Sequence, residues 1–430
     1  MLWRYCPLFT RYFTAKMHRV TIILSALMLT QNAVAQCSLS AYTEQVVEYS
    51  NTLQEAKLRS ESAEAELRRI RREYLPELSF DRTAEVEFGY SSTGRPWSWA
   101  TALELRQIVW QGGAVTADRR KQEAEVAIRE LSNELTLRGV VLEARRAYWA
   151  LSYAEQMESS MKHYTEIVRT LCEVIRRRYD EGYSAKGDLL QMESRLSDAE
   201  YQLSTYEEQY KRALHAFNTL AGNDIERQTE LTESILTITE LPKRCDVKAF
   251  EAEHPERLIA ELRAEGARWG VKRVLSNYLP KVDIRTYGTL QPSLPHTKLS
   301  SLDLSGGAVV NFSSVIYHFG ERREAVAAAK AEQLTYELEV ENVVDDLRLR
   351  EQDAWTRVTG TRQRLEALSR GLATADENLE ISTYAYNEGQ TTILDVMQAQ
   401  ISWLQTYRNV LGAHYDYAIA VAEYSYITGD

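Results

Sequence analysis

The sequence is poor in the residues that end secondary-structure elements: its 430 residues include only 8 prolines and 19 glycines. Because proline and glycine mark the turns between elements, this scarcity argues against a set of small compact domains and predicts long unbroken elements. Beyond the N-terminus, no stretch approaches the ~20 apolar residues that cross a bilayer, which excludes a polytopic helical membrane protein. Positive charge is also in deficit, with 51 Lys and Arg against 62 Asp and Glu. A nucleic-acid partner is therefore not expected.

Signatures of catalysis and metal binding are missing as well. The 7 histidines are scattered, without an HExxH motif or a pair of cysteines at metal-ligand spacing. The segment from Gly182 to Gly187 has the glycine spacing of a phosphate-binding loop, but Asp188 stands where that loop needs a lysine. We expect no catalytic residue, no metal and no cofactor, so the chain is predicted not to be an enzyme.

The N-terminus has the pattern of an export signal. After Met17, a short polar start leads into an apolar stretch and then to Ala33-Val34-Ala35, which fits the small-x-small rule for cleavage. We expect residues 1–35 to be a signal peptide, with either Met1 or Met17 as the start. Two alternatives stay open: a membrane anchor, which needs a longer apolar stretch, and a lipid on Cys37.

The rest of the chain contains the same unit twice. The motif YLPELSF at 74–80 returns as YLPKVDI at 278–284. The segment 179–191 returns at 386–398 with its Tyr, Glu, Gly, Asp and Gln in register. We therefore predict a duplication.

Each predicted repeat has the same order of elements: an opening helix, two strands and two long helices. Pro76 and Pro280 end the opening helices, because the residue before a proline is pushed out of the helical region. Apolar residues then alternate with polar ones, as in two-faced strands. No proline occurs from 97 to 241 or from 296 to 430, which predicts very long helices, and their narrow apolar seams are typical of coiled coils.

These patterns give the following expected bounds. The first repeat, residues 36–241, is predicted to contain an opening helix at 38–73, strands at about 77–90 and 97–110, and helices at about 113–181 and 184–221. The second repeat, residues 242–430, is predicted to contain an opening helix at 246–276, strands at about 281–291 and 300–313, and helices at about 320–387 and 391–428.

The four strands have one apolar and one polar face. In the return strand of the first pair, the residues expected on the apolar face are Trp97, Trp99, Leu103, Leu105 and Val109. Exposed strand edges are hazardous in water and forbidden in lipid, so we expect other chains to complete the sheet as a lipid-facing barrel. Trp97 and Trp99 are candidate anchors at the membrane interface. The alternative is a soluble hairpin packed on helices.

Motifs at the strand and helix ends occur in the same order in both repeats. QIVWQGG at 107–113 and VIYHFGE at 315–321 stand where a strand enters a helix, and the glycine turns have the sequences RRYDEGYSAKGDLLQ and AYNEGQTTILDVMQAQ. Together with YLP before each strand pair, they resemble the TolC family of outer-membrane efflux proteins over nearly the whole chain. The resemblance implies a mainly α fold with a membrane β-barrel.

The resemblance further implies a homotrimer in the outer membrane that extends into the periplasm. Three chains would supply one twelve-stranded barrel in outer-membrane lipid and one twelve-helix tunnel. Its implied function is the passive exit duct of a tripartite efflux or type I secretion system, docked on a periplasmic adaptor protein that is coupled to an inner-membrane pump. The alternative function is a periplasmic adaptor or coiled-coil scaffold, but such a protein would not repeat a complete strand-pair and helix-pair unit.

The resemblance also assigns roles near the two glycine turns. The family meets its adaptor there, which implies docking tips at Gly182, Tyr183, Ser184, Gly389, Gln390 and Thr391. Asp395 matches the first of two aspartates that constrict the family's tunnel, whereas Gln398 stands at the second and predicts a weaker acidic gate. Symmetry-related Asp395 carboxylates would repel one another and favour a bound cation or partial protonation. Asp188, the equivalent residue in the first repeat, either joins this constriction or caps the following helix.

Two cysteines open the two repeats in a similar way. Cys37-Ser-Leu-Ser-Ala-Tyr42 and Cys245-Asp-Val-Lys-Ala-Phe250 occupy matching positions, and the periplasm is oxidising. We expect Cys37 and Cys245 to form a disulfide, whereas Cys172 is expected to be a small apolar residue within a helix.

Overall fold

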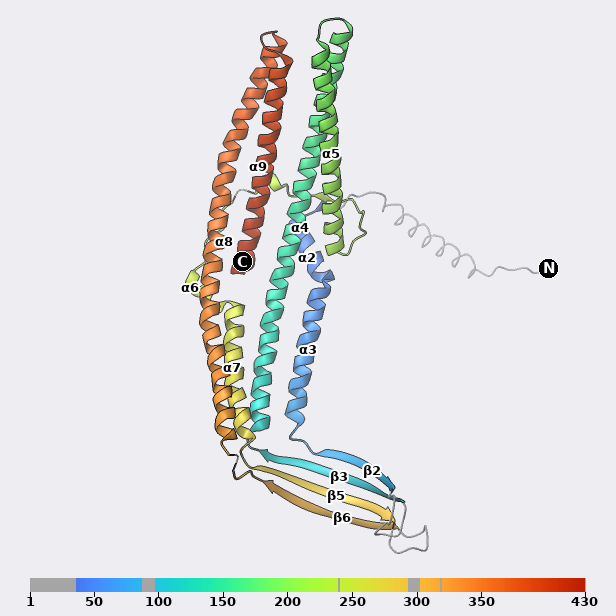
Figure 1. Ribbon diagram of the computed structural model, residues 1–430, viewed down its shortest axis with the longest axis vertical. Helices are drawn as coiled ribbons and strands as arrows, with labels where there is room; N and C mark the ends of the chain where they lie inside the picture. The colour runs from blue at the N-terminus through green and yellow to red at the C-terminus, as the bar shows by residue number, and fades with distance from the viewer. Residues whose placement is uncertain (1–35, 87–96, 239, 293–301, 318, 430) are drawn as a thin grey trace, which may run out of the picture. The chain divides into compact units, whose positions relative to one another are not determined.

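The computed structural model describes residues 36–86, 97–238, 240–292, 302–317 and 319–429 (Figure 1). The predicted signal peptide lies outside the described residues. Contacts divide the chain into two compact units. The first unit consists of Met1–Glu48, Ala144–Thr239 and Leu368–Tyr415, and the second unit consists of Tyr49–Glu143, Glu240–Ala367 and Asp416–Asp430.

The second unit contains a four-stranded antiparallel sheet in the order β2-β3-β5-β6 (Figure 1). Its strands are β2 (Glu77–Val86), β3 (Trp97–Gln111), β5 (Lys281–Pro292) and β6 (Leu302–Ser313). The segments in which apolar and polar residues alternate therefore form strands, as predicted. The predicted end of the first strand, at 87–90, lies outside the described residues.

The helices that lead into the sheet are α3 (Asn51–Arg72) and α7 (Pro255–Ser276). Each ends four residues before a proline, Pro76 or Pro280, as the restriction on the residue before proline requires. Helix α7 lies beside α4 (Ala114–Asp180). The Arg273 guanidinium of α7 is 2.8 Å from the Asp118 carboxylate of α4. This ion pair holds the two helices together close to the sheet.

Both predicted opening helices are divided in the structure. The segment predicted at 38–73 forms α2 (Leu39–Tyr49) and α3, and the Ser50 hydroxyl between them accepts a hydrogen bond from the Leu53 backbone N–H. The segment predicted at 246–276 forms α6 (Val247–Glu253) and α7, with the His254 side chain capping α7. In both places the side chain of the residue between the two helices caps the helix that follows.

The first unit is built around two pairs of helices. Figure 1 shows α4 beside α5 (Lys186–Leu220), and α8 (Glu321–Asn387) beside α9 (Ile393–Thr428), each pair joined by a short turn. Helices α4 and α8 have 67 residues each, which corresponds to about 100 Å. Aromatic rings pack α2 against the first of these pairs: Tyr42 stacks on Phe217 of α5 with ring centroids 3.8 Å apart.

Short elements in the first unit have no counterpart in the predictions. Strand β1 (Gln36–Cys37) pairs in parallel with β4 (Glu230–Leu231), and a 3₁₀ turn follows at Ile235–Thr237. The Glu233 carboxylate accepts a hydrogen bond from the Tyr148 hydroxyl at 2.5 Å. This bond fixes the connection between the repeats to the long helix α4.

Residues 207 positions apart occupy similar environments in the two repeats. Tyr148 and Phe217 have ring centroids 6.3 Å apart, and their counterparts Trp355 and Tyr424 have centroids 5.4 Å apart. The glycines that end α5 and α9, Gly222 and Gly429, both have positive φ values, 68° and 83°. Paired aromatic rings and positive-φ glycines therefore recur at matching positions of the two repeats.

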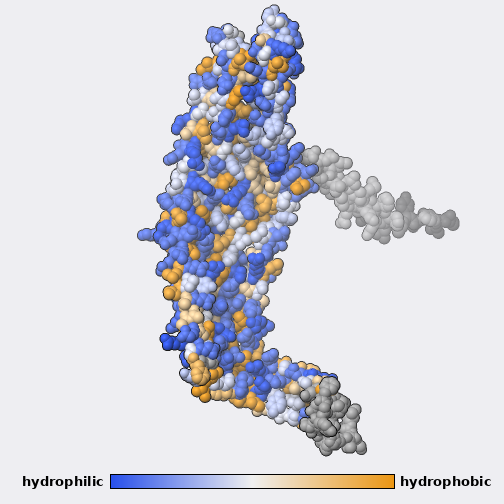
Figure 2. All heavy atoms as spheres, viewed as in Figure 1, coloured by the Kyte–Doolittle hydropathy of each residue, from blue (hydrophilic) through white to orange (hydrophobic). Residues whose placement is uncertain are grey.

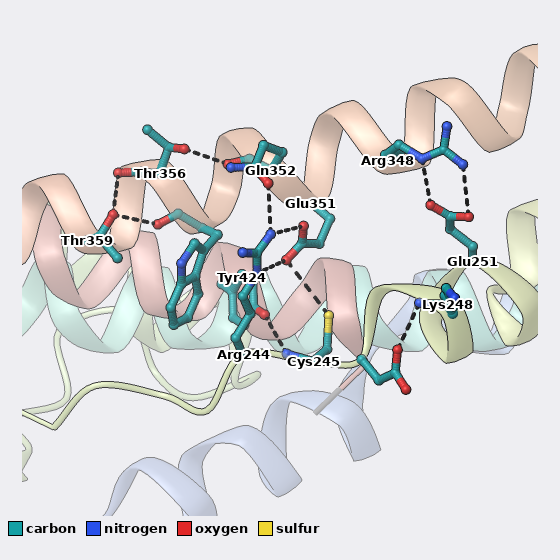
Figure 3. Close-up of polar contacts among 12 residues, drawn as sticks. Arg244, Cys245, Lys248, Glu251, Arg348, Glu351, Gln352, Thr356, Thr359 and Tyr424 are labelled. Carbon is teal, nitrogen blue, oxygen red and sulfur yellow. Dashed lines mark hydrogen bonds and ion pairs between the residues drawn. The ribbon is translucent and has the colours of Figure 1, made fainter.

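A buried ion pair anchors the start of the second repeat in the second unit. The Glu351 side chain on α8 is only 1% exposed, and both of its oxygens accept hydrogen bonds from the Arg244 guanidinium, each at 3.1 Å (Figure 3). On the other side, the Cys245 backbone N–H donates to the Tyr424 hydroxyl of α9 at 2.9 Å (Figure 3). The segment before α6 is thereby attached to both α8 and α9.

The predicted disulfide is contradicted by the structure. Cys37 and Cys245 are both free. The Cys245 sulfur lies 3.9 Å from a Glu351 carboxylate oxygen, and the Cys37 backbone carbonyl lies 3.1 Å from the Tyr148 hydroxyl. Each cysteine thus has a separate set of partners within its own repeat. Cys172 is buried in α4, as predicted for a small apolar residue.

Candidate functional site

One face of the sheet is apolar and exposed. Phe80 on β2 and Phe312 on β6 are each 67% exposed. The other large apolar residues exposed on this face are Leu78, Leu103, Leu105, Ile284, Leu304 and Val310. An exposed apolar surface of this kind marks a site of contact with lipid or with another protein.

The opposite face of the sheet is polar and contains ion pairs. The Arg285 guanidinium on β5 lies 3.1 Å from the Glu104 carboxylate on β3. Next to it, the buried Asp283 side chain accepts a hydrogen bond from the Asn311 amide on β6 at 3.2 Å. The sheet is therefore amphipathic, with one face suited to lipid and the other to water.

The sheet is open at both sides within the described part of the chain. Its outer strands are β2 and β6, and each pairs with only one other described strand. Open strands expose backbone donors and acceptors that lipid cannot satisfy. An apolar face beside two open edges therefore requires further strands before the sheet can lie in a membrane.

A β-bulge changes which residues of β3 share the apolar face. The register with β5 shifts between Ile108 and Trp110, so Trp110 pairs with Val282 on the apolar side. Val109, which was predicted on this face, lies in the bulge and has no partner in the register, whereas Trp110 is an aromatic residue of this face that the sequence pattern missed. A bulge is set by pairing with the neighbouring strand and leaves no local signal in the sequence.

The two predicted interface tryptophans lie at the start of β3. Trp99 pairs with Ala84 in the register of β2 and β3, and the Arg82 guanidinium lies 5.5 Å from its ring centroid. Trp97 pairs with Val86. Both residues therefore lie on β3 at the strand end farther from α4.

The two glycine turns have the same backbone geometry. Gly182 and Gly389 have φ values of 81° and 72°, which favour glycine. The Tyr183 N–H donates to the Arg178 carbonyl at 2.7 Å, and the Gln390 N–H donates to the Ala385 carbonyl at 2.8 Å. This is the six-to-one hydrogen bond of a Schellman motif, so both turns end their helices in the same way.

The predicted tip residues differ in exposure. Tyr183 is 82% exposed, and Gly182, Gly389 and Gln390 are also exposed. Ser184 and Thr391 are half-buried. A Cβ built on either glycine would meet no atom within 4 Å. The glycines therefore leave open space around the turns, next to one large exposed aromatic ring.

Asp395 caps helix α9. Its carboxylate accepts hydrogen bonds from the Thr392 backbone N–H at 2.9 Å and from the Thr392 hydroxyl at 2.7 Å. The side-chain and backbone hydrogen bonds from Thr392 hold the pKa of Asp395 below its usual value. The side chain is exposed and charged, as is required of a residue in an acidic constriction.

The other two predicted constriction residues, Gln398 and Asp188, do not cap a helix as Asp395 does. Gln398 is exposed on α9. Asp188 lies in the first turn of α5, and its carboxylate is 3.4 Å from the Ser184 hydroxyl. The N-terminus of α5 has no side-chain capping hydrogen bond. The two repeats therefore begin their last helices differently, since only the second has a capping hydrogen bond.

A contact between two long helices lies close to both turns. The Arg178 guanidinium on α4 donates to the Tyr386 hydroxyl on α8 at 2.7 Å. Farther along the helices, the Arg408 guanidinium on α9 lies 5.3 Å from the Tyr206 ring centroid on α5. These contacts join the two helix pairs of the first unit, and sequence periodicity within one helix does not reveal them.

Two kinds of site are missing from the part of the chain that the structure describes. No group of three or more His, Cys, Asp or Glu side chains is arranged to hold a metal ion among the described residues. Within the same residues, no helix is long and apolar enough to cross a membrane.

The sequence model of the outer membrane efflux protein family matches residues 43–223 and 249–430. The chain belongs to this family. Among curated proteins, it is similar to the outer membrane efflux protein BepC of Brucella suis biovar 1, with 21% identity over 332 residues, which cover 77% of this chain and 71% of BepC. The family is thus shown by a match to both repeats.

Solved structures share the fold of this outer membrane efflux protein. A membrane protein from Pseudomonas aeruginosa superimposes with a TM-score of 0.79 at 16% identity, covering 93% of each chain. The CmeC outer membrane channel of Campylobacter jejuni has a TM-score of 0.79 at 16% identity, covering 91% of this chain and 85% of CmeC. These likenesses confirm the predicted fold class.

Family and fold together fix the coarse function. The chain is an outer membrane efflux protein with the fold of the solved outer-membrane structures. The alternative prediction, a periplasmic adaptor or coiled-coil scaffold, is not favoured by these matches.

Proposed function

We propose that three copies of this chain form one passive duct in the outer membrane. The observation that carries the proposal is the amphipathic sheet, which exposes Phe80 and Phe312 on one face and ends in two open strands, β2 and β6. Antiparallel pairing of β6 of one copy with β2 of the next supplies hydrogen-bond partners for the backbone groups of both outer strands. Three such sheets give a twelve-stranded barrel with its apolar face toward lipid.

The long helices supply the periplasmic part of the proposed duct. Three copies of the pairs α4–α5 and α8–α9 give a twelve-helix tunnel continuous with the barrel. The two repeats, 36–241 and 242–430, contribute equivalent pieces, in line with the matching ring pairs Tyr148–Phe217 and Trp355–Tyr424.

The proposed role is the exit duct of a tripartite efflux or type I secretion system. Such a duct takes substrate from an inner-membrane pump through a periplasmic adaptor protein. The turns at Gly182 and Gly389 suit adaptor docking, because they combine open space around each glycine with the exposed Tyr183 ring. Hydrophobic side chains next to small residues allow close approach of a partner helix.

Asp395 is the proposed constriction residue of this duct. Its capping hydrogen bonds fix the carboxylate at the start of α9 and keep it charged. Three carboxylates near one axis favour cations. Asp188 and Gln398 are proposed to line the same region with weaker charge.

Membrane fractionation tests the assembly with a matched pair of variants. Phe80→Arg puts a charge on the proposed lipid face, whereas Ser79→Arg puts the same charge on the polar face one residue away. Wild type and Ser79→Arg should require detergent for extraction from the outer membrane and should cross-link to the mass of three chains. Phe80→Arg should lose most of this outer-membrane trimer, because a mid-membrane Arg costs about 2–4 kcal/mol. Equal trimer yields for the two variants, or soluble monomeric wild type, would contradict the proposal.

A further inference from the structure

Positive charge is concentrated where the helices adjoin the sheet. We define the basic collar as the ten residues nearest the sheet in each of four helices: 63–72 of α3, 114–123 of α4, 267–276 of α7 and 321–330 of α8. The collar contains 13 Lys and Arg against 6 Asp and Glu. The next ten residues of the same helices contain 5 Lys and Arg against 9 Asp and Glu. A chain of net charge −11 thus has a positive belt beside its strands.

Part of this charge has a partner within the protein. Arg273 pairs with Asp118, and Arg71 pairs with Glu123. The Lys272 ammonium lies 3.7 Å from the centroid of the Trp269 ring. Cationic and aromatic side chains of this kind commonly lie together at the level of lipid headgroups.

Other collar cations have no ion pair among the described residues. Arg322, Arg323 and Lys330 are exposed at the start of α8 and form none of the described salt bridges. Arg322 and Arg323 lie in the first turn, where the positive end of the helix dipole disfavours cations. Helix stability therefore does not account for these side chains.

These three cations line a cavity of about 650 Å³ between the end of α7 and the start of α8. Its apolar lining includes Leu275, Ile316 and Val326. Ile316 itself is 97% exposed, and Phe319, beside the cavity, is 90% exposed. Figure 2 shows hydrophobic residues gathered where the sheet meets the helices. The cavity thus combines an apolar surface with three positive charges.

We propose that this cavity binds an anionic glycerophospholipid from the periplasmic leaflet of the outer membrane. The phosphate would lie against Arg322, Arg323 and Lys330, and the acyl chains would lie along Ile316 and Val326. The position follows from the fold: the apolar strands occupy the hydrocarbon and the helices continue into the periplasm, so their junction lies at the periplasmic headgroups. Clusters of Lys and Arg next to a membrane segment bind anionic lipids in this way. The inference rests on the proposed outer-membrane assembly.

The test measures lipid retained by the purified oligomer after reconstitution with phosphatidylglycerol or with phosphatidylcholine. The variant is R322Q/R323Q/K330Q, and its control is K57Q/K211Q/R212Q, which removes three exposed cations outside the collar. Native mass spectrometry should show phosphatidylglycerol on wild type and on the control, with at least about tenfold less on the variant. Retention on wild type should fall with rising ionic strength, since salt screens exposed charges. The salt dependence is measured on the wild-type protein alone.

Equal retention of the two lipids, or equal retention by variant and control, would overturn the inference. Loss of trimer in the variant without any lipid on wild type would also overturn it and would assign the cavity to contact with a second copy of the chain. The trimer mass is recorded in the same spectra. An intact trimer without lipid therefore refutes only the lipid site, whereas the absence of a trimer refutes the proposed assembly.

Discussion

The Arg178 guanidinium donates a 2.7 Å hydrogen bond to the Tyr386 hydroxyl and lies 5.5 Å from the centre of the same ring. Arg178 precedes Gly182 by four residues, and Tyr386 precedes Gly389 by three. The two residues lie on different long helices, α4 and α8, next to the two turns. The contact therefore links the two helix pairs at the mouth of the proposed duct.

Breaking this link should widen the mouth. We expect Arg178→Ala and Tyr386→Phe each to raise single-channel conductance in planar bilayers, and the double variant to show no further increase, because both changes remove one shared hydrogen bond. Arg177→Ala is the matched control, since the Arg177 guanidinium bonds only the Glu173 carbonyl of its own helix among the described contacts. Additive effects of the two substitutions would show that the residues act independently.

The exposed ring at the first turn should contribute to adaptor docking. Tyr183→Ala is expected to lower dye export several-fold in cells that depend on this duct, because exposed aromatic rings are common anchors of protein interfaces. Tyr201→Ala, which removes a ring that is 76% exposed farther along α5, should leave export unchanged. Gly182→Trp should abolish export with normal trimer yield. Normal export by both turn variants would exclude the turns as docking tips.

Asp395 should control cation selectivity. Asp395→Asn keeps a hydrogen-bond acceptor for Thr392 but removes the charge, so it should lower cation selectivity and weaken block by multivalent cations in planar bilayers. Within one chain the Thr392 hydrogen bonds lower the pKa from an ordinary value of 3.8, so selectivity should persist from about pH 7 to about pH 5 unless repulsion among the three carboxylates of the trimer outweighs these bonds. Selectivity is then lost as pH falls through the lowered pKa. A selectivity unchanged by Asp395→Asn would remove this role.

The buried Glu351 should make Arg244 important for stability. Arg244→Ala leaves the Glu351 carboxylate buried without its main partner, which should markedly lower the hydrogen-exchange protection of the segment before α6. Arg348→Ala breaks the more exposed pair with Glu251 (Figure 3) and should leave this protection nearly unchanged, because exposed ion pairs contribute little to stability. Hydrogen exchange of the segment before α6 measures the difference. Equal protection in the two variants would contradict the assigned anchor.

Strands, long helices and glycine turns could be predicted because their signals are local. A proline four residues after a helix, a period of two and a glycine with positive φ each act within a few residues. Ser50 gave no comparable signal, since a single capping side chain does not interrupt the helical pattern of the opening segment. The two-residue strands β1 and β4 are too short to show any period.

The parts that were missed depend on contacts between distant segments. The bulge that brings Trp110 to the apolar face arises from pairing with β5, and the burial of Glu351 depends on Arg244 more than a hundred residues earlier. The disulfide prediction was wrong, since Cys37 and Cys245 are both free: matching positions in two repeats indicate equivalence and do not imply proximity. The adaptor and constriction residues remain predictions, since they act in an assembly of several chains.

The central claim, that three copies form one conducting duct in the outer membrane, is tested most directly by the single-channel conductance of the oligomer purified from outer membranes. We predict a discrete, cation-selective conductance that co-purifies with the mass of three chains and is retained in Ser79→Arg preparations. An outer-membrane trimer that conducts no ions, including after Arg178→Ala loosens its mouth, would contradict the account.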